Sequence, residues 1–118
     1  MMKRFCVIDG QGGGIGAAII KALKTRYGES IEIWALGTNA VATAQMLKAG
    51  ANRGSTGENP VIRTTDGVDV ILGPVAITWP NAMMGEVTPR MAEAVCSSAA
   101  VKILIPLHHE NVVLVGSS

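Results

Sequence analysis

A cluster of glycines at residues 10–16 restricts the fold of this chain more than any other feature, since five of these seven positions are glycine. An apolar, β-favouring run at residues 5–8 precedes the cluster, and a segment with helical periodicity follows it. Glycines between a strand and a helix let a ligand approach the backbone, and the first N–H groups of a helix attract an anion. The pattern therefore predicts a β-α-β unit with a phosphate site at residues 10–16.

The rest of the chain continues to alternate between strand and helix patterns. We expect strands at residues 5–8, 31–36, 68–72, 102–107 and 112–115, and helices at residues 15–27, 40–49 and 89–98. Residues 53–66 are polar and predict an irregular segment, with a short extended piece at residues 61–63. Residues 108–111 predict a hairpin turn, which would add an antiparallel strand at one edge. The prediction is a single α/β domain over residues 1–118, a three-layer Rossmann-like sandwich with a mostly parallel sheet and an antiparallel edge strand.

Composition agrees with this fold class and narrows the possible partners. The chain is 48% hydrophobic and only 3% aromatic, so its core must be aliphatic, as in strands buried on both faces. A net charge of +1 without a run of basic residues argues against a nucleic-acid partner. No apolar stretch is long enough to cross a bilayer, and Cys6 and Cys96 are isolated, as in a reducing compartment. We expect a cytoplasmic protein with no membrane or nucleic-acid partner.

Two interpretations of the glycine cluster remain open, a phosphate-binding loop and a tight structural turn. The spacing of Gly10, Gly14 and Gly16 is similar to the loop of short-chain dehydrogenases. An ordinary member of that class is excluded, because the only tyrosine, Tyr27, has Ile31 four residues later where the catalytic pair requires lysine. No carboxylate stands at residues 36–39, where an acidic residue would hold the ribose of NAD. NAD(P) or another nucleotide therefore remains possible as cofactor, without a specific assignment.

Other residues are candidates for the same site. Asp9 either closes a local turn or acts as a Mg²⁺ ligand or general base, and Glu58 is a second weak catalytic candidate within the polar residues 53–60. Thr38 and Asn39 end the second strand, and Gly73 and Pro74 end the third strand on the same edge of the sheet. The predicted cofactor-binding residues are Gly10, Gln11, Gly12, Gly13, Gly14, Ile15, Gly16, Thr38, Asn39, Gly73 and Pro74.

Two further segments contain side chains that occur in subunit contacts or in metal sites. Residues 78–86 contain a tryptophan and two methionines, which favours either a lid or subunit contact, or packing over the core. His108, His109 and Glu110 are adjacent, and neighbouring side chains on a strand point to opposite faces, so we expect no metal site there.

Motifs along nearly the whole chain resemble a small bacterial family known only as a domain of unknown function. They are Val7-Ile8-Asp9-Gly10-Gln11-Gly12-Gly13-Gly14-Ile15-Gly16, Ala35-Leu36-Gly37-Thr38-Asn39, Lys48-Ala49-Gly50-Ala51, Thr56-Gly57-Glu58-Asn59 and Gly85-Glu86-Val87-Thr88-Pro89. The resemblance implies a Rossmann-like fold and brings no activity with it.

The sequence thus predicts a protein that binds a nucleotide or dinucleotide through its phosphate, as a sensor or regulator. The chain supplies little more than one mononucleotide-binding half, so we expect a homo-oligomer. The alternatives are a small enzyme with its active site at an interface between copies, or a structural subunit without ligand. Phosphate binding requires that the backbone N–H groups of residues 12–16 have no partner within the protein.

Overall fold

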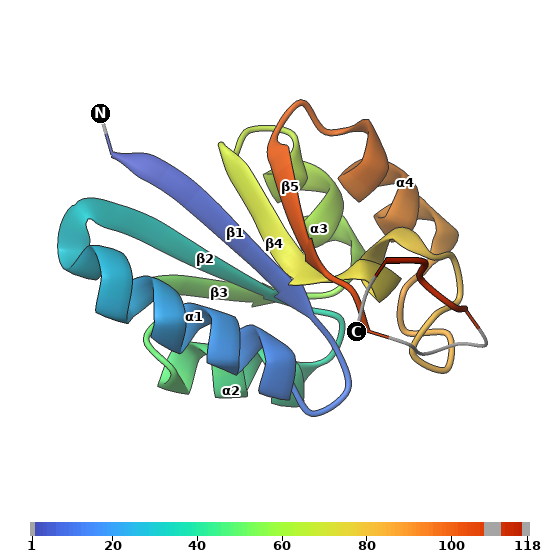
Figure 1. Ribbon diagram of the computed structural model, residues 1–118, viewed down its shortest axis with the longest axis horizontal. Coiled ribbons are helices and arrows are strands. Elements are labelled where there is room, and N and C mark those ends of the chain that lie inside the picture. The colour runs from blue at the N-terminus through green and yellow to red at the C-terminus, as the bar shows by residue number, and fades with distance from the viewer. Residues whose placement is uncertain (1, 108–111, 117–118) are drawn as a thin grey trace.

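Five parallel strands form one sheet in the computed structural model, which describes residues 2–107 and 112–116 (Figure 1). The strands are β1 (Lys3–Asp9), β2 (Ile31–Gly37), β3 (Arg53–Thr56), β4 (Val70–Pro74) and β5 (Val101–Ile105). Their order in the sheet is β3-β2-β1-β4-β5. The chain moves outward from β1 to β3 and then returns to the other side of β1, so the strand order reverses between β1 and β4. This confirms the Rossmann-like α/β fold.

Helices cover both faces of the sheet. Figure 1 shows α1 (Gly14–Tyr27) and α2 (Ala40–Lys48) on one face, and α3 (Glu58–Thr65) and α4 (Pro89–Ser97) on the other. Two short 3₁₀ turns, η1 (Gly28–Ser30) and η2 (Val75–Thr78), follow α1 and β4. The expected helix starts at residues 40 and 89 are confirmed, and the side chains of Asn39 and Thr88 cap these two helices.

The strands place their side chains alternately in two apolar clusters. The cluster beneath α1 and α2 contains Val7 and Ile20, and the cluster beneath α3 and α4 contains Cys6, Ile8 and Val95. Because both faces are buried, a shift of one residue in strand register would exchange the two sets of side chains and is disfavoured. Within the described ranges, no helix combines the length and the apolar character needed to cross a membrane.

The predicted antiparallel edge strand is wrong. β5 runs parallel to β4, and residues 112–116 form no strand. Val113 and Val115 are 78% and 100% exposed, so these apolar side chains do not pack against the core. The predicted hairpin turn at residues 108–111, and with it the His108–Glu110 cluster, lies outside the described residues.

The prediction for residues 53–66 is also wrong. This segment contains β3, which pairs with β2, and α3, which begins at Glu58. All four residues of β3 are exposed, so the strand lacks the apolar alternation by which strands are recognised. In α3 only Val61 and Thr65, one helical turn apart, are buried. Pairing and packing with distant segments, rather than local propensity, define both elements.

Candidate functional site

A cleft lies where the strand order reverses, at the carboxyl ends of β1 and β4. Its volume is about 400 Å³. One wall consists of residues 9–15, from the end of β1 into α1, and the other of Pro74 and Ala76 with Met83. Ligands of open α/β sheets bind at this place, because the loops after two neighbouring strands leave in opposite directions and open a crevice. We call it the switch-point cleft.

Three glycines of the loop at residues 10–16 are required by packing. A Cβ on Gly10 would lie 2.3 Å from Thr38 Oγ1, and a Cβ on Gly13 would lie 2.8 Å from the backbone Cα of Ala42. Gly13 also has a φ of +74°, which favours glycine. A Cβ on Gly16 would lie 2.5 Å from the nearest side-chain atom of α2. The fold itself accounts for these three positions.

Gly12 and Gly14 differ from the other three. No heavy atom lies within 4 Å of a Cβ built on either residue, and neither has a positive φ. Both line the switch-point cleft. Nothing in the packing requires glycine at these two positions, so a side chain there would extend into open space.

Most N–H groups of the loop already have partners within the protein. Gly10 N and Gly16 N donate to the two carboxylate oxygens of Asp9, at 2.8 and 2.7 Å. Gly13 N donates to the Gly10 carbonyl at 2.9 Å. Gly12 N and Gly14 N donate to no group of the described chain. The free N–H groups that phosphate binding requires are thus reduced to two, at the same positions where packing does not demand glycine.

The Asp9 side chain lies under the loop and is only 2% exposed. Burial raises the pKa of its carboxyl, and it outweighs the opposite effect of the N–H groups of Gly16, Gly10 and Ile15. The nearby charge of Glu86 raises this pKa further. Both oxygens of Asp9 accept hydrogen bonds from the loop, as the turn-closing interpretation of this residue requires.

Glu86 joins three parts of the site and was not a sequence-based candidate. Its Oε1 accepts hydrogen bonds from Gln11 N at 2.8 Å, Thr38 Oγ1 at 2.6 Å and Asn39 Nδ2 at 2.9 Å. Burial raises the pKa of Glu86, but these three donors together lower it more, so the net shift is downward. The expected acidic residue at the end of β2 is missing from the local sequence, yet a carboxylate from a distant segment occupies that place.

Glu86 belongs to residues 79–87, which connect η2 towards α4. Ala82 and Val87 are buried in the core, so packing over the core is part of the role of this segment. Asn81, Met83 and Met84 all have φ between +57° and +68°, which is uncommon outside glycine. Backbone strain of this kind gathers near functional sites, and here it accompanies the insertion of Met83 into the cleft wall.

Of the remaining sequence candidates, only Pro74 lines the cleft. Glu58 accepts a hydrogen bond from Thr88 Oγ1 at 2.6 Å and pairs with Arg90 at 3.4 Å, so it joins the starts of α3 and α4. Thr38 and Asn39 contact Glu86 and do not line the cleft. Gly73 and Pro74 end β4, and Gly73 packs against the backbone of β1.

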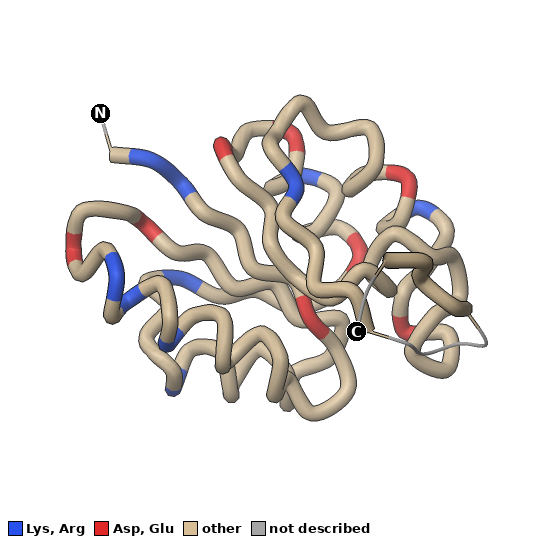
Figure 2. The backbone as a smooth tube through the Cα atoms, viewed as in Figure 1, with Lys and Arg blue, Asp and Glu red and all other residues tan. Residues whose placement is uncertain are grey.

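Among the residues that the structure describes, no lysine or arginine lines the cleft. The loop after β1 and the segment between β4 and α4 contain no lysine or arginine (Figure 2). The two charged side chains at the site, Asp9 and Glu86, are both acidic. An anionic ligand would therefore depend on backbone N–H groups alone.

Fold and site together define a Rossmann-like α/β protein with an open cleft at the switch point of its sheet. A family model described as a domain of unknown function (DUF3842) matches residues 4–118, so the chain belongs to that family. No curated protein and no solved structure matches the chain.

Proposed function

We propose that this protein binds a small phosphate-bearing ligand, of the size of a mononucleotide or less, in the switch-point cleft. The observation that carries the proposal is the coincidence at Gly12 and Gly14. Both residues line the cleft, both have an N–H group without a partner in the described chain, and neither needs to be glycine for the fold. Close approach of a ligand to the backbone explains all three properties.

Glu86 occupies the space beyond the end of β2 and so limits the size of the ligand. In dinucleotide-binding folds the adenosine ribose lies there against an acidic residue. Here Glu86 holds Thr38 and Asn39 in that position. A dinucleotide would require residues 79–87 to move away, whereas a mononucleotide or a sugar phosphate fits a cleft of about 400 Å³ as it stands.

The test is ligand binding by paired glycine variants. Thermal shift and titration calorimetry would use inorganic phosphate, AMP, GMP, ribose 5-phosphate, NAD(H) and NADP(H). Gly12→Val and Gly14→Val should each fill the cleft and abolish binding while the protein stays folded. Ala18→Val is the control, because Ala18 is exposed on α1 close to the loop and does not line the cleft. Binding that survives in both cleft variants would refute the proposed site.

One observation favours catalysis as a second candidate function. Asp9 lines the cleft and has a pKa raised by burial, which is a property of residues that transfer protons. Any turnover found with a bound ligand should then be lost in Asp9→Asn. Unchanged turnover in that variant would leave Asp9 with the structural role of holding the loop.

A further inference from the structure

A second candidate site lies around Trp34 of β2, on the face of the sheet that α3 and α4 cover. In the strand register Trp34 pairs with Cys6 of β1 and Arg53 of β3, so all three side chains point to the side of α3. Two hollows, of about 200 and 340 Å³, meet at Trp34 and Thr64. β3 is exposed along its whole length, so this part of the sheet is open to a ligand.

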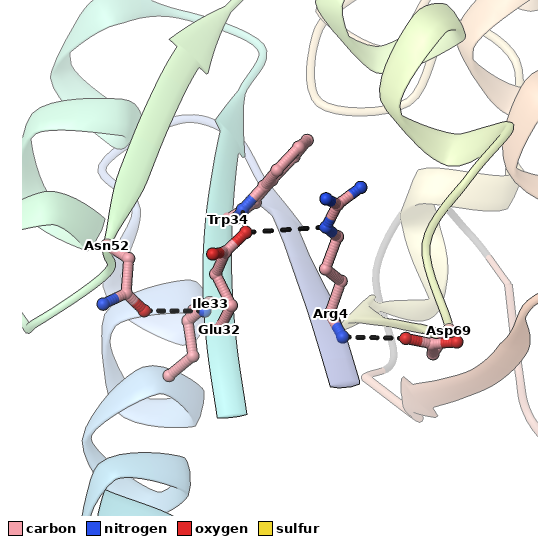
Figure 3. A network of polar contacts seen from close by, with 6 residues as sticks. All are labelled: Arg4, Glu32, Ile33, Trp34, Asn52 and Asp69. Carbon is pink, nitrogen blue, oxygen red and sulfur yellow. Dashed lines mark hydrogen bonds and ion pairs between the residues drawn. The ribbon is translucent and has the colours of Figure 1, made fainter. Parts of the chain in front are cut away.

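Three arginines surround the indole of Trp34. The Cζ atoms of Arg4 and Arg53 lie 4.8 and 5.7 Å from the centre of its ring, within the range of cation–π attraction. Arg63 lines the same hollow as Arg4 and Trp34. Figure 3 shows the side chains of Arg4 and Trp34 extending from neighbouring strands, with the carboxylate of Glu32 beside both.

The acidic residues nearby leave part of this positive charge unbalanced. Glu32 accepts a hydrogen bond from Trp34 Nε1 and lies 3.6 Å from Arg4 Nε (Figure 3). Asp69 accepts the backbone N–H of Arg4 at 2.8 Å. Neither Arg53 nor Arg63 forms an ion pair with any residue that the structure describes. Two guanidinium groups therefore face the hollows without a counter-charge.

We infer that the hollows around Trp34 form a binding site for a small ligand with two or more negative charges, such as a tricarboxylate or a polyphosphate. The planar guanidinium groups of Arg53 and Arg63 would each bind one carboxylate or phosphate group through paired hydrogen bonds. Trp34 forms the apolar floor between them, held by its hydrogen bond to Glu32. The site is separate from the switch-point cleft, with which it shares no residue.

Tryptophan fluorescence tests this inference directly. The chain has two tryptophans, so Trp79→Phe leaves Trp34 as the only reporter. Titration with citrate and with tripolyphosphate, at constant ionic strength set by chloride, should give a saturable change in Trp34 emission. Arg53→Gln and Arg63→Gln should each weaken binding by about tenfold, as expected for loss of a charge-assisted contact. Gly12→Val should leave this binding unchanged, whatever happens at the switch-point cleft.

Arg26→Gln provides a matched control. Arg26 is exposed and lies 5.8 Å from the ring of Tyr27, so it reproduces an arginine over an aromatic ring at a distance from Trp34. Equal weakening in Arg26→Gln would indicate general charge screening and would overturn the inference, as would the absence of a saturable signal up to the highest anion concentration. If Trp79→Phe does not fold, calorimetry on the wild type and the three arginine variants applies the same criteria.

Discussion

Replacing two adjacent glycines by alanine should have opposite effects on stability. A Cβ at Gly12 meets no atom within 4 Å and its φ is not positive. Gly12→Ala should therefore be neutral or should stabilise the protein by up to about 0.5–1 kcal/mol, because alanine restricts the unfolded chain. At Gly13 the φ of +74° alone costs alanine about 1–2 kcal/mol.

The contact at Gly13 adds to this cost. The new Cβ would lie 2.8 Å from the Cα and 2.9 Å from the carbonyl oxygen of Ala42, and these backbone atoms of α2 cannot rotate away as a side chain would. Overpacking of this kind costs about 1–3 kcal/mol, so together with the cost of the positive φ Gly13→Ala should destabilise the protein by about 2–5 kcal/mol. Urea unfolding of wild type and both variants measures the difference directly, through a change in midpoint at constant slope.

The assignment of Gly12 to ligand binding depends on this contrast. If Gly12→Ala destabilised the protein as much as Gly13→Ala, then glycine at position 12 would serve the fold. The reason for placing a ligand there would then disappear. A stable Gly12→Ala that also loses ligand binding would connect the missing side chain to binding alone.

Three further predictions concern Asp9, Glu86 and Ile20. Burial raises the pKa of Asp9 in the folded protein. The stability that Asp9 contributes is therefore complete below its ordinary pKa of 3.8 and is lost as the pH rises through its folded-state pKa. Urea unfolding between pH 3 and 7 should show this loss in the wild type and not in Asp9→Asn. Three hydrogen-bond donors lower the pKa of Glu86, so the stability that Glu86 contributes is present above its ordinary pKa of 4.5 and is lost as the pH falls. Glu86→Ala should lower the free energy of unfolding by about 1 kcal/mol at pH 7 and by less at pH 3. The same variant should speed hydrogen exchange in residues 79–87. Ile20→Ala should destabilise the core by about 2–5 kcal/mol in thermal unfolding, since Ile20 is fully buried, and a smaller loss would mean that α1 packs loosely.

The sequence predicted those elements whose signals are local. The strand at residues 5–8 and the helix starts at residues 40 and 89 each depend on a few neighbouring residues, and the structure contains all three. The sequence analysis did not predict β3, because pairing with β2 holds its polar residues in place. The paired residues Trp34 and Arg53 are 19 positions apart in the sequence. Pairing with a distant strand does not require an apolar pattern in β3 itself.

The site shows the same division. The glycine loop and Pro74 could be predicted, because the carboxyl ends of parallel strands share one edge of the sheet. Glu86 could not, since it reaches Gln11 across 75 residues and stands in an irregular segment where periodicity gives no position. The pairing of Asp9 with Gly16 follows from geometry of the loop that glycine content alone leaves undetermined.

The charge of Asp9 restricts which anions the cleft can accept. An ionised Asp9 already offsets the partial positive charge of the α1 N-terminus, on which anion binding usually depends. For a phosphate charge about 6 Å from that carboxylate, the repulsion amounts to about 3 kcal/mol at an effective dielectric constant of about 20. Two backbone N–H groups, at about 1.5–3 kcal/mol each when they bond to a charged group, only just exceed this repulsion. For the proposed function we therefore expect a ligand with one phosphate group to bind better than a triphosphate. We also expect protonation of Asp9, which burial favours, to strengthen binding because a neutral carboxyl does not repel the phosphate.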